Sequence, residues 1–153
     1  MTNLDVKRVD HVSYTVSDID RSVDFYSKFG YRPVNRYAAS GPELDVAVAT
    51  ENADMEIQVM RRPDGGMLEL ISYVRQPSER AARNSVVGAA HLAFVVGDIQ
   101  AAYEELTADG VEFLSEPNTD RYGEKWVYFR DPDGITVELM QPEADSQRTV
   151  SQS

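Results

Sequence analysis

The chain has 153 residues, 42% hydrophobic and 27% charged, a composition typical of a globular protein with a packed core. Its net charge of −11 repels a phosphate backbone, so nucleic acid is not an expected partner. The absence of cysteine excludes disulfides, thiol nucleophiles and thiolate metal ligands. There is neither a membrane-spanning apolar run nor a signal-peptide pattern, so no membrane association and a cytoplasmic location are expected.

The first predicted element is a strand over residues 9–16, where the residue types alternate with a period of two. Val12 and Tyr14 lie on one face of this strand, and His11 and Ser13 lie on the other. Because one face of such a strand packs against the rest of the fold, we expect the histidine face to point away from the helices.

A helix is predicted after this strand. Asp18 is a suitable N-cap, and Ile19, Val23 and Tyr26 recur at helical spacing. Gly30 suits the left-handed position that ends many helices. Together these signals predict one short amphipathic helix between Asp18 and Gly30.

Three strands are predicted to complete this first module. Residues 44–49 and 54–60 are interpreted as the middle strands. Pro63-Asp64-Gly65 marks a turn into the last strand, which contains Glu69. In that last strand, alternation puts Glu69 on the face opposite its apolar neighbours, Leu68 and Leu70.

The second half of the chain repeats this pattern. The segment from His91 to Ile99 matches the segment from His11 to Ile19 at an offset of 80 residues, whereas the Pro-Asp-Gly and Glu-Leu matches have an offset of 69. The second copy is therefore shorter in its middle, where residues 126–130 are predicted as a strand. We interpret the chain as one α+β domain of two tandem βαβββ modules. Its predicted parts are module 1, about 8–74, a linker, 75–87, module 2, about 88–142, and a disordered tail, 143–153.

Each module contributes one histidine and one glutamate at matching positions. His11 and His91 are the only histidines of the chain, and each opens the first strand of its module. Glu69 and Glu138 lie in the two last strands. Imidazole and carboxylate groups are suitable ligands for Zn, Ni, Co, Mn, Mg or Fe. We therefore predict one divalent metal ion held by His11, Glu69, His91 and Glu138.

These residues and their surroundings resemble the vicinal oxygen chelate superfamily, which includes glyoxalase I, methylmalonyl-CoA epimerase, extradiol dioxygenases and bleomycin-resistance proteins. The likeness covers roughly residues 8–142. The likeness rests on these segments: Asp10-His11-Val12, residues 18–26, Leu68-Glu69-Leu70, His91-Leu92-Ala93-Phe94, residues 128–134 and Val137-Glu138-Leu139. The resemblance implies paired modules that form a cupped mixed sheet around a metal site, often in a homodimer.

The family's ligand positions can be compared residue by residue. The metal positions of glyoxalase I fall on the four predicted ligands, whereas methylmalonyl-CoA epimerase typically has Gln at the position of Glu69. Glyoxalase I usually holds glutathione with an Arg and an Asn. At those two positions this chain has Thr15 and Tyr73. The resemblance therefore implies a glyoxalase-type metal site but puts glutathione recognition in doubt.

The leading functional hypothesis is a metal-dependent isomerase, epimerase or lyase. Glu69 or Glu138 would remove a proton beside a metal-chelated carbonyl of a small metabolite. One alternative is an Fe(II)-dependent extradiol-type dioxygenase, because His11, His91 and Glu138 match its facial triad. Another alternative is a non-catalytic small-molecule binding or resistance protein. The substrate itself is not indicated by the sequence.

Overall fold

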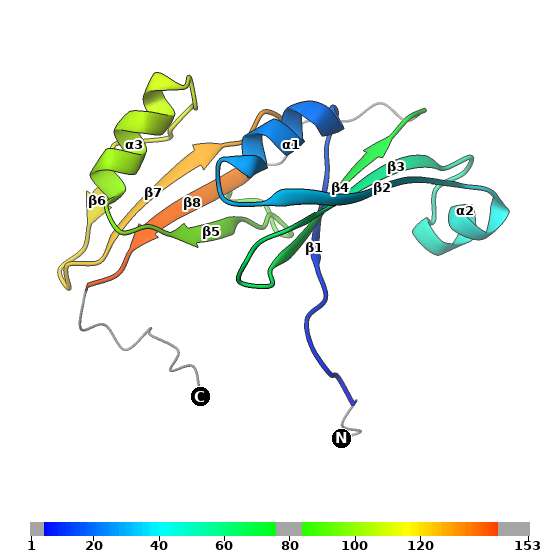
Figure 1. Ribbon diagram of the computed structural model, residues 1–153, viewed down its shortest axis with the longest axis horizontal. Coiled ribbons are helices and arrows are strands. Elements are labelled where there is room, and N and C mark those ends of the chain that lie inside the picture. The colour runs from blue at the N-terminus through cyan, green and yellow to red at the C-terminus, as the bar shows by residue number, and fades with distance from the viewer. Residues whose placement is uncertain (1–4, 76–83, 144–153) are drawn as a thin grey trace. The chain divides into compact units, whose positions relative to one another are not determined.

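A computed structural model describes residues 5–75 and 84–143 of the chain (Figure 1). The chain divides into two compact units, unit 1 (Met1–Glu79) and unit 2 (Arg80–Ser153). The division falls in the predicted linker, of which residues 76–83 lie outside the described residues, as do residues 144–153 of the predicted tail. Within the described ranges, no helix is long and apolar enough to cross a membrane.

Unit 1 forms a four-stranded mixed sheet with the order β1-β4-β3-β2. The first and last strands, β1 and β4, are parallel neighbours, and the other neighbouring strands are antiparallel. Its elements are β1 (Val12–Thr15), α1 (Ile19–Ser27), β2 (Arg32–Ser40), α2 (Pro42–Val48), β3 (Asp54–Arg61) and β4 (Met67–Tyr73).

Unit 2 forms a second mixed sheet with the corresponding order, β5-β8-β7-β6, and its first and last strands are again parallel. Its elements are β5 (Leu92–Val95), α3 (Ile99–Ala108), β6 (Asn118–Thr119), β7 (Lys125–Arg130) and β8 (Thr136–Gln141). Both units therefore contain a strand, a helix and three strands in chain order, and unit 1 has the additional helix α2 between β2 and β3. The predicted α+β class with two tandem βαβββ modules is confirmed.

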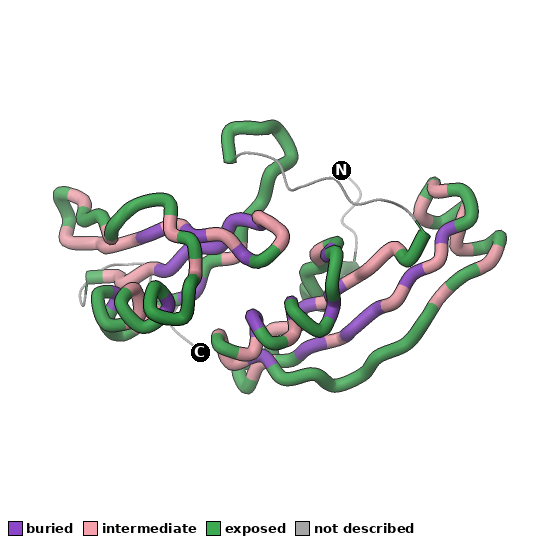
Figure 2. Tube along the Cα trace, turned by 90° about the horizontal axis from the view of Figure 1, so that it is seen from above, coloured by how far each residue is buried: buried purple, intermediate pink, exposed green. Residues whose placement is uncertain are grey.

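The core of each unit lies between its helix and one face of its sheet. In unit 1, the ring of Tyr14 stacks on that of Tyr26 in α1 at 6.0 Å between centroids, and Leu70 is fully buried. In unit 2, Ile99 of α3 and Leu139 of β8 are about as deeply buried. Figure 2 shows the buried residues following the strands of both units. Burial of this apolar surface stabilises the units and leaves the opposite sheet faces for other uses.

The predicted helix ends are confirmed. The Asp18 side chain accepts a hydrogen bond from the backbone N–H of Arg21, and Asp98 accepts from the N–H groups of Gln100 and Ala101. Gly30, just after α1, has a φ of 83°, which is strained for any residue with a Cβ. The sequence therefore sets where α1 begins and where the chain turns away from it.

Loss of a cap gives the first testable prediction. We expect Asp98→Ala to lower the free energy of unfolding by about 1 kcal/mol, because two backbone donors at the start of α3 lose their acceptor. Urea denaturation followed by circular dichroism measures this change. The matched control is Glu105→Ala on the exposed side of α3, which should stay within about 0.5 kcal/mol of the parent. Equal stability of the two variants would contradict the capping role.

The prediction of a strand over residues 44–49 is wrong, because α2 (Pro42–Val48) occupies this stretch. Pro42 stands in the first helical turn, where its fixed φ is favourable and its missing N–H costs nothing. The side chain of Asp45 accepts a 2.8 Å hydrogen bond from the N–H of Ala53 and so ties the helix to the start of β3. Local backbone chemistry outweighed the alternation of apolar residues here.

The strand that actually follows α1 is β2 (Arg32–Ser40), which alternation did not indicate. It is an edge strand whose residues are almost all exposed, and it contains Pro33. A bulge at Val34 shifts its pairing with β3 between Pro33 and Asn35. In unit 2 the corresponding strand, β6, has only two residues. The longer β2 and the additional α2 lie in the stretch between the two matches, where the repeat offset falls from 80 to 69 residues.

Candidate metal centre

In unit 1, His11 and Glu69 meet on the sheet face that points away from α1. Ser13 of β1 lies opposite Glu69 of β4, and His11 precedes Ser13 by two residues, so all three side chains share a face. The Nε2 atom of His11 lies 3.4 Å from Oε2 of Glu69. The predicted face of His11 is therefore the observed one, and the parallel pairing of β1 with β4 creates the contact.

In unit 2, the same pairing brings His91 to Glu138. Ala93 of β5 lies opposite Glu138 of β8, and Nε2 of His91 lies 3.1 Å from Oε2 of Glu138. The Glu138 side chain is 9% exposed, compared with 17% for Glu69. A carboxylate this far removed from water needs hydrogen-bond partners or a cation.

Tyr128 makes the second pair different from the first. It lies opposite Glu138 across β7 and β8, and its ring meets that of His91 edge-on at 5.4 Å between centroids. Its hydroxyl is hydrogen-bonded to the Glu138 carboxylate, while partial burial and the charge of Glu138 raise the pKa of Tyr128. The phenol therefore stays protonated at neutral pH and donates to Glu138. In unit 1 the residue opposite Glu69 is Val59, which has no hydrogen-bonding side chain.

His11 has an additional partner that orients its ring. Its Nδ1 atom lies 3.3 Å from Oδ2 of Asp10. This hydrogen bond, together with the nearby positive charge of Arg8, holds the pKa of Asp10 below its usual value. In the neutral tautomer that donates from Nδ1 to Asp10, Nε2 is the nitrogen that carries the lone pair, and it faces Glu69. A carboxylate on the far nitrogen is the common arrangement around metal-binding histidines.

The structure thus gathers the four predicted ligands as two pairs. Among the residues that it describes, no group of three or more His, Cys, Asp or Glu side chains is close enough to hold a metal ion. Each pair nevertheless directs an imidazole nitrogen and a carboxylate oxygen to the same point, and these donors suit a divalent ion. The chemistry of the donor set therefore fits a metal.

Sequence reasoning assigned no face to Trp126, Tyr128 and Arg130. The pairing of Tyr128 with Glu138 puts all three on the face of the second His–Glu pair, because they alternate along β7. Knowledge of the β7–β8 register would have given this result. Alternation within a single strand cannot give this result, because it does not show which face of one strand matches which face of the next.

Comparisons with known proteins agree with the fold. Residues 8–139 match the model of the Glyoxalase/Bleomycin resistance protein/Dioxygenase superfamily. The chain is 36% identical over 145 residues to a 2-epi-5-epi-valiolone epimerase from an Actinomyces species, covering 86% of this chain and 78% of that protein. It is 24% identical to the metallothiol transferase FosB of Staphylococcus saprophyticus, over 88% of this chain and 76% of the relative. A glyoxalase family protein from Bacillus cereus superposes with a TM-score of 0.81 at 26% identity, over 92% and 97% of the two chains.

Proposed function

We propose that the chain is a divalent-metal-dependent epimerase or isomerase of a small carbonyl metabolite. The starting point is that the chain belongs to the glyoxalase/bleomycin resistance protein/dioxygenase superfamily. The observation that carries this proposal is the His–Glu pair that recurs at the same place in both units. The similarity to an epimerase supports this chemistry over the other reactions of the superfamily.

The ligands that we propose for one divalent ion are His11, Glu69, His91 and Glu138. Zn, Ni, Co, Mn, Mg and Fe all accept such nitrogen and oxygen donors. When bound, a divalent ion supplies Lewis acidity that stabilises negative charge on the carbonyl oxygen of the substrate. The hydrogen bond between His11 and Asp10 fixes which nitrogen of that ring faces the site.

The two glutamates supply the proton transfers. A carboxylate beside the carbonyl removes the proton from the neighbouring carbon, and inversion requires that a proton return on the other face. Glu69 and Glu138 come from different units and provide two such groups. Tyr128 donates to Glu138 and so holds that carboxylate in one orientation. We assign the base role to these two residues and a positioning role to Tyr128.

The direct test uses the substrate named for the related epimerase. We expect the metal-loaded full chain to exchange the hydrogen beside the ketone of 2-epi-5-epi-valiolone with deuterium from D₂O and to form the epimer, as followed by proton NMR. Removal of the metal with a chelator should abolish both signals. Tight binding without exchange would contradict the proposal and favour a binding protein. Oxygen uptake that requires iron would contradict it in favour of the dioxygenase alternative.

A further inference from the structure

A small polar cluster lies at one end of the unit 2 sheet, on the face that carries the His91–Glu138 pair. Arg130 ends β7, and its strand partner in β8 is Thr136. Thr136 stands two residues before Glu138, so Arg130 and Thr136 share the face of Glu138 and lie about 7 Å from it along the strands. Arg130 is therefore a neighbour of a group to which we assign proton transfer.

The contacts of its guanidinium group hold Arg130 on this face. Nη1 donates to the hydroxyl of Thr136 and, at 3.2 Å, to the backbone oxygen of Gly134. Thr136 is 6% exposed, and its hydroxyl donates in turn to the side chain of Asn84 at 2.5 Å. Because the Thr136 side chain emerges on the same face as Glu138, the guanidinium that contacts it lies on that face too. The position of Arg130 is thus fixed by buried polar partners.

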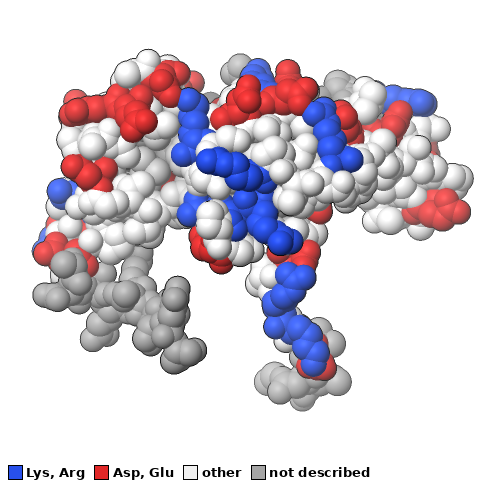
Figure 3. Space-filling view, viewed as in Figure 1, with Lys and Arg blue, Asp and Glu red and all other residues white. Residues whose placement is uncertain are grey.

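The guanidinium group has further donors that no described protein group uses. It carries five N–H groups, and both of its hydrogen bonds to the described residues come from Nη1. Within residues 5–75 and 84–143, no carboxylate forms an ion pair with Arg130. Figure 3 shows carboxylates gathered over α3, which contains Glu104 and Glu105 and covers the other face of the unit 2 sheet. The remaining donors are therefore available to a ligand on the His–Glu face.

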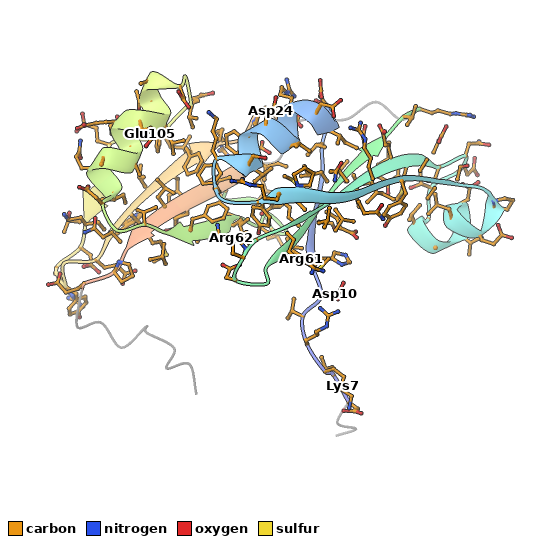
Figure 4. The ribbon with its side chains drawn as sticks, in the orientation of Figure 1. Lys7, Asp10, Asp24, Arg61, Arg62 and Glu105 are labelled. Atoms are coloured by element: carbon orange, nitrogen blue, oxygen red, sulfur yellow. The ribbon has the colours of Figure 1, made fainter. Side chains whose placement is uncertain are left out.

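The described part of unit 1 has no equivalent of this anchored arginine. At the corresponding place, Arg61 ends β3 and lies opposite Met67, two residues before Glu69 (Figure 4). Its hydrogen bond goes to the sulfur of Met67 at 3.8 Å, and a thioether sulfur is a weak acceptor. Arg61 is also exposed, whereas Arg130 is half-buried. The two His–Glu pairs therefore differ in the polar groups that surround them.

A neutral hydroxyl is a better partner for these donors than an anion. The guanidinium group already donates to one neutral hydroxyl, that of Thr136. The carboxylate of Glu138 lies on the same face, and the chain has a net charge of −11, so an anionic group is repelled. A hydroxyl oxygen accepts a charge-assisted hydrogen bond without that repulsion.

We propose that Arg130 is a specificity-determining residue that binds a hydroxyl group of a neutral, hydroxylated ketone, whose carbonyl is handled by the His–Glu residues. This inference rests on the proposed function and names its substrate class. A separation of about 7 Å between the two strand positions suits a small ring that carries its hydroxyl and carbonyl groups on different carbon atoms. Because Thr136 and Gly134 already fix the guanidinium group, little side-chain freedom is lost when the hydroxyl binds.

The test measures binding to the full chain after removal of metal, so that chelation cannot contribute. Trp126 is the only tryptophan and shares the face of Arg130 and Glu138, so its fluorescence reports a ligand there. One titration uses 2-epi-5-epi-valiolone, whose ring carries hydroxyl groups, and another uses cyclohexanone, whose ring carries none. We expect Arg130→Met to raise the Kd of 2-epi-5-epi-valiolone about tenfold, because a charge-assisted hydrogen bond is lost, and to leave that of cyclohexanone within about twofold.

Arg36→Met is the matched control, because Arg36 lies on the helix-covered face of the unit 1 sheet, where it pairs with Asp20 of α1. It should leave both Kd values within about twofold of the parent. Circular dichroism and metal content verify that each variant is folded.

The two proposals fail in different ways. Absence of deuterium exchange in the metal-loaded parent, with the binding pattern retained, contradicts the proposed reaction but not the role of Arg130. An unchanged Kd of 2-epi-5-epi-valiolone in Arg130→Met, or no binding by the parent, would overturn the inference. Tighter binding of succinate than of 2-epi-5-epi-valiolone would also overturn it, because the arginine would then select an anion.

Discussion

We expect Glu138→Gln to lower the rate of substrate proton exchange by about 100-fold to 10,000-fold, the usual contribution of a general base. The amide keeps an oxygen that can ligate a metal and accept the hydrogen bond from Tyr128, but it cannot take up a proton. Glu138 is the more buried of the two glutamates and the one with the additional phenol partner. Deuterium incorporation from D₂O measures the effect, and metal content measured in parallel separates lost chemistry from lost binding.

The matched control is Glu56→Gln, on the other face of the unit 1 sheet beside Arg36. We expect its exchange rate to stay within about twofold of the parent. Glu69→Gln tests whether the first pair has the same role as the second. Unchanged exchange in Glu138→Gln, with metal still bound, would remove this residue from the proton-transfer steps.

His11→Ala/His91→Ala is expected to lose bound metal almost completely. Each substitution removes the imidazole from one His–Glu pair, and a lone buried or half-buried carboxylate is a poor site for a transition metal. Elemental analysis by mass spectrometry of protein purified without chelator gives the number of ions per chain. We expect about one in the parent, as four ligands around one ion require, and less than about a tenth of that in the double variant.

The single variants distinguish a shared ion from two separate ones. If the four residues hold one ion, His11→Ala and His91→Ala should each lose most of the metal. If each pair binds its own ion, the parent should contain about two per chain and each single variant should retain about one. A parent chain that takes up no metal on reconstitution would contradict the metal site altogether.

The repeat was the most informative signal in the sequence. It predicted two modules of equal topology because His, Asp-Ile, Gly, Pro-Asp-Gly and Glu recur in the same order, and each of these marks a strand, a cap or a turn. The caps at Asp18 and Asp98 followed from side-chain chemistry that acts within three residues. These caps depend only on neighbours along the chain, and they were predicted correctly.

In the middle of module 1 the strand over residues 54–60 was predicted correctly as β3, whereas β2 and α2 were not predicted. The edge strand β2 has one exposed side chain after another, so alternation gives no signal. In α2 the apolar residues alternate in sequence, but Pro42 and the hydrogen bond from Ala53 to Asp45 decide the conformation. Cross-strand register was equally invisible, which is why the sequence did not place Tyr128 beside Glu138 or Arg130 beside Thr136.

The position of each His–Glu pair within its sheet has a consequence for how such modules can diversify. The pair joins the first and last strands, whereas the stretch that differs in length between the units forms the opposite edge, β2 with α2 in one and β6 in the other. Insertions and deletions at that edge leave the β1–β4 and β5–β8 registers unchanged. Duplicated copies can therefore acquire new binding surfaces by lengthening or trimming the outer strand, while the geometry of the His–Glu pair is inherited intact.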